Sequence, residues 1–226
     1  MNSYVGAISQ STHSVLAKTF SLVGFSMIPT ILGAFLVSQI PNSYYMLHPS
    51  LAMWGGIGLF LLSLGLMFFA MRQRNPTVAI SAFMLFAFVI GCSIGPVIMV
   101  ALQQANGFQI VLDAAALTAL SLWGLTAYAV YSKKDFSFLG GFLFVGLLLL
   151  IGSMFLSFFI HSSVFYLTIN AVGVLIFLGY ILFDVSRIVR GGETNYIFAA
   201  IQIYLDIINL FMNILSILLI LTGNKK

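Results

Sequence analysis

The chain is a succession of long apolar runs separated by short polar connectors. Of its 226 residues, 61% are hydrophobic and only 6% are charged, and the mean hydropathy is +1.12. An ordinary soluble domain carries about a quarter charged residues, and its apolar runs rarely approach the ~20 residues that span a bilayer. The sequence therefore predicts a polytopic membrane protein and excludes the soluble globular classes.

The length accommodates about seven membrane spans with their loops. Apolar windows predict helices at residues 19–40, 51–71, 77–101, 110–131, 138–160, 164–190 and 195–222. The connectors are too short to hold a separate folded domain. We therefore expect an all-α protein with a cytoplasmic N-terminal segment at 1–18, a single seven-helix membrane domain at 19–222 and a short external tail at 223–226.

The basic residues predict the orientation, because cytoplasmic loops of membrane proteins carry an excess of Lys and Arg. Two of the nine, Lys225 and Lys226, lie at the C-terminus. The other seven lie on the side shared by the N-terminus and the even-to-odd connectors: Lys18, Arg72, Arg74, Lys133, Lys134, Arg187 and Arg190. This pattern places the N-terminus in the cytoplasm and the C-terminus outside. Because the charges are scattered over several loops, no nucleic-acid partner is expected.

The third predicted span contains a motif of small residues, GCSIGP at 91–96. Gly91 and Gly95 have the spacing that lets two membrane helices approach closely, and Pro96 is expected to bend the helix. Cys92 has no second cysteine to pair with, and it is interpreted as a small apolar filler. The motif thus predicts helix packing rather than a binding site.

Two of the five acidic residues lie well inside predicted spans. Asp113, Asp135 and Glu193 fall near span ends or in connectors, where charge is tolerated. Asp184 and Asp206 instead lie within hydrocarbon, where an ionised carboxylate costs roughly 2.5 to 3.5 kcal/mol at the bilayer centre. Such residues persist when they face a cavity or a partner, so both are candidate functional residues.

The last predicted helix has a polar stripe along one face. Its members recur at intervals of four, three, four and three residues: Gln202, Asp206, Asn209, Asn213 and Ser216. The preceding helix repeats this spacing less strongly, with Asn170, Gly173, Phe177, Tyr180, Asp184 and Arg187. A helix with one polar side among apolar neighbours is expected to be central. The amides and hydroxyls are equally explained as hydrogen bonds between helices, and that alternative stays open.

The last two predicted helices are expected to form an antiparallel hairpin. Gly191 and Gly192 act as a helix stop, and Thr194 is a candidate N-cap for the final helix. Counting from this turn places Asp184 about 10 Å deep and Asp206 about 18 Å deep. A tilt or a break in a helix must close this offset if the two carboxyl groups touch.

Three segments together resemble one known family. The stretch GYILFDVSRIVRGGETNYIFAAIQIYLDIINLFMNIL (179–215) is similar to the signature of the Bax inhibitor-1 family of seven-span proteins. SAFMLFAFVIGCSIGPV (81–97) and TAYAVYSKKDFSFLGG (126–141) resemble that family's third span and its fourth-to-fifth connector, in the form typical of bacterial members. The resemblance covers about two thirds of the chain and implies a central seventh helix and a bacterial cytoplasmic (inner) membrane location.

The resemblance also implies two functions. Some members have a pH-sensitive calcium leak controlled by an aspartate pair, which corresponds here to Asp184 and Asp206. Those members use a basic partner, for which Arg72, Arg74 and Arg187 are candidates, although the acidic residue that they carry in the second span is absent here. Other bacterial members, some with the same GGETNY connector, are modulators of the FtsH membrane protease.

The leading hypothesis is a proton-sensitive calcium or cation leak, with the lipid bilayer, Ca²⁺ and H⁺ as partners and no tightly bound cofactor. Two carboxylates in a low-dielectric site cannot both ionise cheaply, so they are expected to share a proton, and losing it leaves hard oxygens suited to Ca²⁺. An intramembrane aspartyl protease is not favoured, because Gly-x-Gly-Asp is replaced here by Ile203-Tyr204-Leu205-Asp206. No enzymatic activity is therefore expected, and modulation of the FtsH protease is the alternative.

Overall fold

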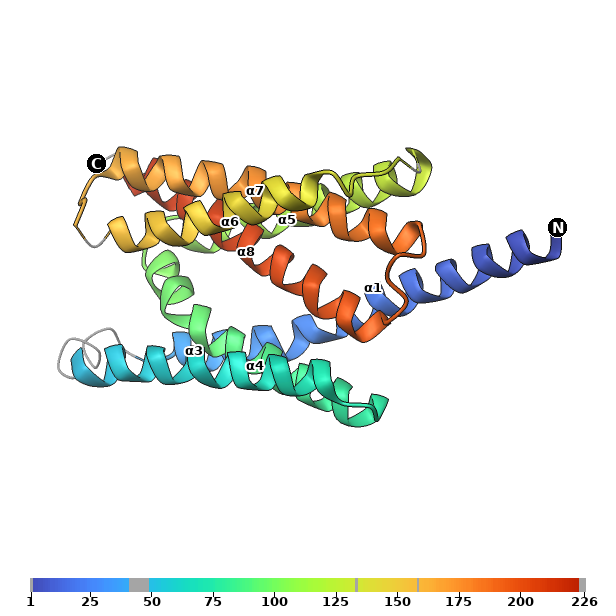
Figure 1. Ribbon diagram of the computed structural model, residues 1–226. Helices are drawn as coiled ribbons and strands as arrows, with labels where there is room; N and C mark the ends of the chain where they lie inside the picture. Colours follow the sequence, from blue (N-terminus) through green and yellow to red (C-terminus); the bar gives the residue numbers. More distant parts are fainter. Residues whose placement is uncertain (1, 41–48, 133, 158, 224–226) are drawn as a thin grey trace. The chain divides into compact units, whose positions relative to one another are not determined.

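The computed structural model describes residues 2–40, 49–132, 134–157 and 159–223, and these residues contain helices and no strand (Figure 1). Lys133, Lys225 and Lys226 lie outside them. The helices are α1 (Asn2–Ser38), α3 (Pro49–Arg72), α4 (Pro76–Leu102), α5 (Gly107–Ser132), α6 (Leu139–Leu156), α7 (Ser163–Val189) and α8 (Tyr196–Gly223). The predicted all-α class with seven helices is confirmed.

The helix ends agree with the sequence prediction to within three residues, except at two places. α1 begins at Asn2, where the prediction began at residue 19, and so the predicted N-terminal segment is helical and continuous with the first span. The segment contains no proline, so nothing in it stops the helix from extending. α6 ends at Leu156, ahead of the predicted residue 160. Its 18 residues still measure about 27 Å, close to the thickness of the hydrocarbon core.

Six of these helices are long and apolar enough to cross a membrane, by length and composition. They are α1 from Thr12, α4, α5, α6, α7 and α8. The remaining helix, α3, adds an apolar stretch over Ile57–Arg72. These lengths and compositions are those of a multi-pass membrane protein.

The chain divides into two compact units, of which one is the continuous segment Thr19–Gly107. In this unit α3 packs beside α4. Asn75 caps α4 by accepting a hydrogen bond from the Thr77 N–H at 3.0 Å, and Pro76 occupies the first turn, where its missing N–H costs nothing.

The glycine motif of α4 lies directly against α1. A Cβ atom placed on Gly91 would lie 2.1 Å from the Thr30 carbonyl oxygen, and one on Gly95 would lie 2.6 Å from Val37 Cβ. The approach is reciprocal, since a Cβ on Gly33 of α1 would lie 2.3 Å from the Phe88 carbonyl oxygen. The predicted packing role of Gly91 and Gly95 is confirmed, with α1 as the partner helix.

The second unit combines the N-terminal stretch Met1–Lys18 with Phe108–Lys226. Within it α7 packs against both α6 and α8. α8 is the inner helix, because every residue from Tyr196 to Ile220 is buried or half-buried, whereas α6 buries only Leu143 and Leu150. This burial agrees with the predicted central position of the last helix.

We predict that Gly91→Ala destabilises the protein by about 1–3 kcal/mol, because the new methyl group meets the backbone of α1, which cannot move as a side chain can. Thermal unfolding in detergent micelles, followed by circular dichroism, measures the loss. Gly65→Ala in α3 is the matched control, since its methyl group meets nothing within 4 Å. Equal melting temperatures for the two variants would contradict the packing role of Gly91.

Candidate functional site: an aspartate pair between two helices

The two candidate carboxyl groups meet at the interface between α7 and α8. Asp184 of α7 and Asp206 of α8 lie close enough to interact electrostatically, and their exposed fractions are 6% and 7%. The Oδ2 atom of Asp206 is buried and has no hydrogen-bond partner in the described part of the chain. Hydrocarbon disfavours such an unpaired oxygen, and at this place a proton, a water molecule or a cation could satisfy it.

A crossing of the two helices brings the pair together. Gly173 lies against Asn213, because a Cβ on Gly173 would fall 2.2 Å from Asn213 Oδ1. This contact and the Asp184–Asp206 contact are eleven residues apart on α7 (184 − 173) but seven on α8 (213 − 206). The helices therefore cross at an angle, as Figure 1 shows, and tilt closes the offset predicted from the sequence.

Three of the remaining members of the polar stripe form side-chain hydrogen bonds within α8. Asn209 donates to the Leu205 carbonyl at 2.8 Å, and Asn213 donates to the Asn209 carbonyl at 2.7 Å. Ser216 likewise donates to the carbonyl one turn earlier, at 2.7 Å, and Gln202 is half-buried. These bonds within one helix do not support the alternative that the stripe joins helices by hydrogen bonds. Asp206 is the member of the α8 stripe that interacts electrostatically with a carboxyl group of α7, that of Asp184.

Of the three candidate basic partners, Arg187 lies beside the pair. Its Nη1 atom is 3.9 Å from Asp184 Oδ1, and its Nη2 atom is 3.4 Å from Glu193 Oε2. Arg72 and Arg74 are exposed residues at the end of α3 and just after it, in the other unit. Their role as gating partners stays a prediction.

The turn that joins α7 to α8 fixes the position of Arg187 and Glu193. Gly191 has a φ of +73°, the Gly191 N–H bonds the Ile188 carbonyl at 3.0 Å, and the Gly192 N–H bonds the Arg187 carbonyl at 2.9 Å. This is the Schellman pattern, which confirms the predicted helix stop. Positive φ strongly favours glycine at this position.

The N-cap of α8 is Asn195, and the prediction of Thr194 was wrong. Asn195 Oδ1 accepts hydrogen bonds from the N–H groups of Ile197 at 3.0 Å and Phe198 at 3.2 Å. Glu193 Oε1 in turn accepts the Asn195 N–H at 2.8 Å. Thr and Asn are both good capping residues. Residue type therefore does not decide between two neighbours, and the path of the backbone in the turn does. Glu193, which the sequence placed in an ordinary connector, is thereby attached to the start of α8.

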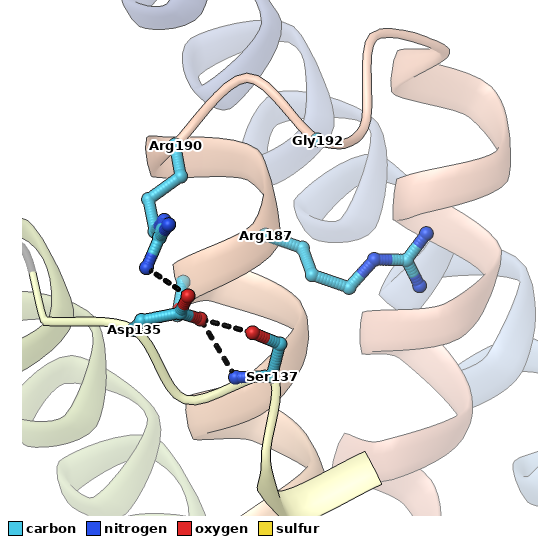
Figure 2. A pocket seen from close by; sticks show the side chains of 6 residues that line it. Asp135, Ser137, Arg187, Arg190 and Gly192 are labelled. Carbon is cyan, nitrogen blue, oxygen red and sulfur yellow. Dashed lines mark hydrogen bonds and ion pairs between the residues drawn. The ribbon is translucent and has the colours of Figure 1, made fainter.

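A second polar cluster lies beside the end of α7, and it was not predicted from the sequence. Arg190 forms an ion pair with Asp135 at 2.5 Å, and both the hydroxyl and the N–H of Ser137 donate to Asp135 (Figure 2). Ser186 donates to the Lys134 carbonyl at 3.4 Å. These contacts attach the α5–α6 connector to α7, and with Arg187 and Gly192 they line a pocket of about 230 Å³.

The charge of Asp135 is stabilised where it stands. The hydrogen bonds from Ser137, with the Arg190 guanidinium, hold the pKa of Asp135 below its usual range. A lowered pKa means that the carboxylate, and with it the ion pair to Arg190, persists at neutral pH and is lost only as the pH falls through that lowered value. In Figure 2 the Arg187 side chain extends away from this ion pair, toward α8. The two arginines of the pocket therefore contact different carboxylates: Arg190 contacts Asp135, and Arg187 contacts Asp184 and Glu193.

We predict that Asn195→Ala lowers the free energy of unfolding by about 1 kcal/mol, because two N–H groups at the start of α8 lose their acceptor. Thr194→Ala is the control that separates the two neighbouring residues, and it should leave stability within about 0.5 kcal/mol of the parent. Equilibrium unfolding in detergent measures both. A larger loss for Thr194→Ala would restore Thr194 as the cap.

Comparisons with known proteins support the resemblance seen in the sequence. The family model described as inhibitor of apoptosis-promoting Bax1 matches residues 12–223. An uncharacterized membrane protein of Vibrio cholerae is 37% identical over 94% of this chain and 92% of its own length. The modulator of FtsH protease YccA of Escherichia coli K12 is 36% identical over 92% of this chain and 90% of its own.

Similar proteins also occur outside bacteria and under other names. Protein lifeguard 4 of Mus musculus is 32% identical over 93% of this chain and 87% of its own. In another Escherichia coli strain, a protein with the same 36% identity is named inner membrane protein YccA. Since the family model and these relatives each span nearly the whole described chain, the chain belongs to the Bax inhibitor-1 family.

Proposed function

We propose that the protein is a pH-sensitive calcium or cation leak of the bacterial inner membrane, gated by Asp184 and Asp206. One observation carries the proposal: two carboxyl groups are buried face to face between α7 and α8, and one oxygen of Asp206 has no partner among the described residues. Nothing in helix packing requires two carboxyl groups there, because the neighbouring amides of the stripe bond within α8.

The proposed mechanism follows from the charge of the pair. With one proton shared, the carboxyl groups form a short charge-assisted hydrogen bond that holds α7 and α8 together. When that proton leaves, two carboxylates repel each other in a low-dielectric place, and the crossing of the helices is weakened at this point. The freed oxygens are hard ligands of the kind that Ca²⁺ prefers.

Ca²⁺ is proposed as a permeant ion rather than a resident one. Calcium takes six to eight oxygen ligands, and the pair offers at most four carboxylate oxygens. Water and backbone carbonyl groups must supply the rest, which favours brief occupancy over tight binding. The proposed activity is transport without covalent chemistry, and we assign no catalytic residue.

The test is calcium flux into proteoliposomes of the pure protein across about pH 5 to about pH 8. Flux through the parent protein should change with pH, whereas Asp206→Asn and Asp184→Asn should each make it independent of pH, because Asn keeps size and hydrogen bonding but cannot ionise. The double variant should differ little from either single one, since groups that act as a unit are not additive.

Asn209→Ala is the control for this experiment, because Asn209 lies on the same stripe but bonds within α8. It should retain the pH dependence of the parent. If the Asp→Asn variants fall apart in detergent, while a pH response survives in whatever folded fraction remains, the pair is a structural element and the leak proposal fails.

A second candidate function, modulation of the FtsH protease, is favoured by the 36% identity to a protein of that name. We propose that the N-terminal part of α1 takes part in it. This part is attached to the α7–α8 hairpin, because Lys18 Nζ lies 5.7 Å from the centre of the Tyr196 ring and Thr12 Oγ1 approaches Gly191. A helix that continues beyond the apolar span is a suitable surface for a membrane-bound partner.

Overproduction of the protein should lengthen the half-lives of membrane substrates of FtsH, and deletion of residues 2–17 should weaken that effect. Pulse-chase labelling measures the half-lives, and pull-down of FtsH measures the association. Asp206→Asn should retain the effect if modulation and ion leak are separate activities. Unchanged half-lives on overproduction, together with no FtsH in the pull-down, would remove the support for this candidate.

A further inference from the structure

The pocket beside the end of α7 gathers basic side chains from two parts of the chain (Figure 2). Its volume of about 230 Å³ is lined by Arg187 and Arg190 and by the single carboxylate of Asp135. Lys134, the residue before Asp135, is exposed and adds a further cation next to the pocket. The other lining residues are Ser137, Ser186 and Gly192. Cations thus outnumber anions in the lining, which favours an anionic ligand.

Both arginines can accept a further partner. Among the described residues, Arg190 contacts Asp135 through Nη1, so its other nitrogens can donate to a new acceptor. The Arg187 nitrogens lie 3.9 Å from Asp184 and 3.4 Å from Glu193, beyond the roughly 2.7–2.9 Å of a tight charge-assisted hydrogen bond. The side chains of Arg187 and Arg190 are 33% and 43% exposed. A ligand from outside can therefore reach them.

The last turn of α7 uses its carbonyl groups in its own hydrogen bonds. Free carbonyl groups at a helix C-terminus carry partial negative charge and disfavour an anion. Here the Ser186 carbonyl accepts the Arg190 N–H at 3.0 Å. The Arg187 carbonyl accepts the Gly192 N–H at 2.9 Å. The negative end of the helix is thereby offset at the place where the arginine side chains are presented.

The pocket lies where three apolar spans end. α5 ends at Ser132, α6 begins at Leu139, and the arginines stand in the last turn of α7 and directly after it. Tyr131 and Phe138, on either side of the connector, are 85% and 75% exposed. An exposed tyrosine at the end of a span is typical of the headgroup level of a bilayer. Basic side chains at that level meet the phosphate groups of lipids.

The α5–α6 connector is held in place as one wall of the pocket. Phe136 is buried, and its ring lies 5.8 Å from the Tyr128 ring and 6.5 Å from the Phe138 ring, measured between ring centres. The Ser137 N–H donates to Asp135 at 2.9 Å. A wall that is already ordered lowers the entropy cost of binding a ligand.

We propose that this pocket binds the phosphate group of an anionic phospholipid, with Arg190 as the principal donor and Arg187 as a second positive charge. The planar fork of arginine matches the paired oxygens of a phosphate. Basic pockets between membrane helices bind anionic headgroups. Free phosphate offers the same oxygens, but the lipid adds apolar contact with the exposed rings of Tyr131 and Phe138. This inference requires neither the leak nor protease modulation.

Two variants of the pocket should change lipid binding in opposite directions. Arg190→Gln removes the principal donor and should weaken the binding of short-chain phosphatidylglycerol about tenfold. Asp135→Asn removes the carboxylate that competes for Arg190 and should strengthen binding about threefold, while its amide oxygen still accepts the Ser137 N–H. Arg190→Lys keeps the charge but loses the fork, so its effect should be intermediate. The variants should fold, because exposed ion pairs contribute little to stability.

Native mass spectrometry of the full-length protein in a neutral detergent measures the dissociation constant of each probe. The probes, each added alone, are short-chain phosphatidylglycerol, short-chain phosphatidylcholine and inorganic phosphate. Phosphatidylglycerol should bind most tightly, because the choline cation is repelled by the arginines and inorganic phosphate lacks the apolar chains. Arg74→Gln is the matched control, since it removes one exposed arginine just after α3, in the other unit. It should leave lipid binding unchanged.

A preference for phosphatidylglycerol that Arg190→Gln weakens and Asp135→Asn strengthens supports the inference. Equal effects of Arg190→Gln and Arg74→Gln would mean that surface charge alone attracts the lipid, and would overturn it. Inorganic phosphate that binds as tightly as the lipid overturns the lipid as the occupant. If neither pocket variant changes lipid binding, the Asp135–Arg190 pair is only a structural clamp and the inference fails. Circular dichroism of each variant establishes that the helices are retained.

Discussion

The burial of Asp184 and Asp206 at the interface between α7 and α8 is the constraint that the rest of the hairpin accommodates. Two buried carboxyl groups are costly unless they share a proton or find a cation. The absence of a side chain at Gly173 lets α7 and α8 approach closely further along. The Schellman turn at Gly191 sets the direction in which the chain returns.

Charged side chains follow one another from this pair to the turn between α7 and α8. Asp184 is followed by Arg187, Arg187 by Glu193, and Glu193 by the amide that caps α8. Arg190, three residues beyond Arg187, reaches instead to the α5–α6 connector. A succession of charged side chains thus leads from the buried pair to the exposed turn.

Sequence patterns predicted those features that depend on local chemistry. Apolar runs predicted the helices, the spacing of Gly91 and Gly95 predicted a close helix contact, and Gly191 predicted the helix stop. The Asp135–Arg190 pair was missed, because it joins the α5–α6 connector to the residue that follows α7, and no periodicity records such a contact.

The choice of Asn195 over Thr194 was missed for a different reason, since both residues can cap and the path of the turn decides between them. The contact between the two aspartates was predicted only in part. The stripe predicted the correct face of α8, but the crossing of the helices, which follows from packing along their whole length, was needed to bring the carboxyl groups together.

The N-terminal stretch up to Lys18 belongs to the same compact unit as α5 to α8, although Thr19–Gly107 intervenes in the chain. During synthesis this stretch leaves the ribosome well before the Tyr196 ring that Lys18 contacts is made. The intervening unit is continuous in sequence and can assemble early, because contacts of short sequence separation form first. The stretch up to Lys18 must therefore wait for the α7–α8 hairpin, and the order of biosynthesis makes their docking a late step in maturation.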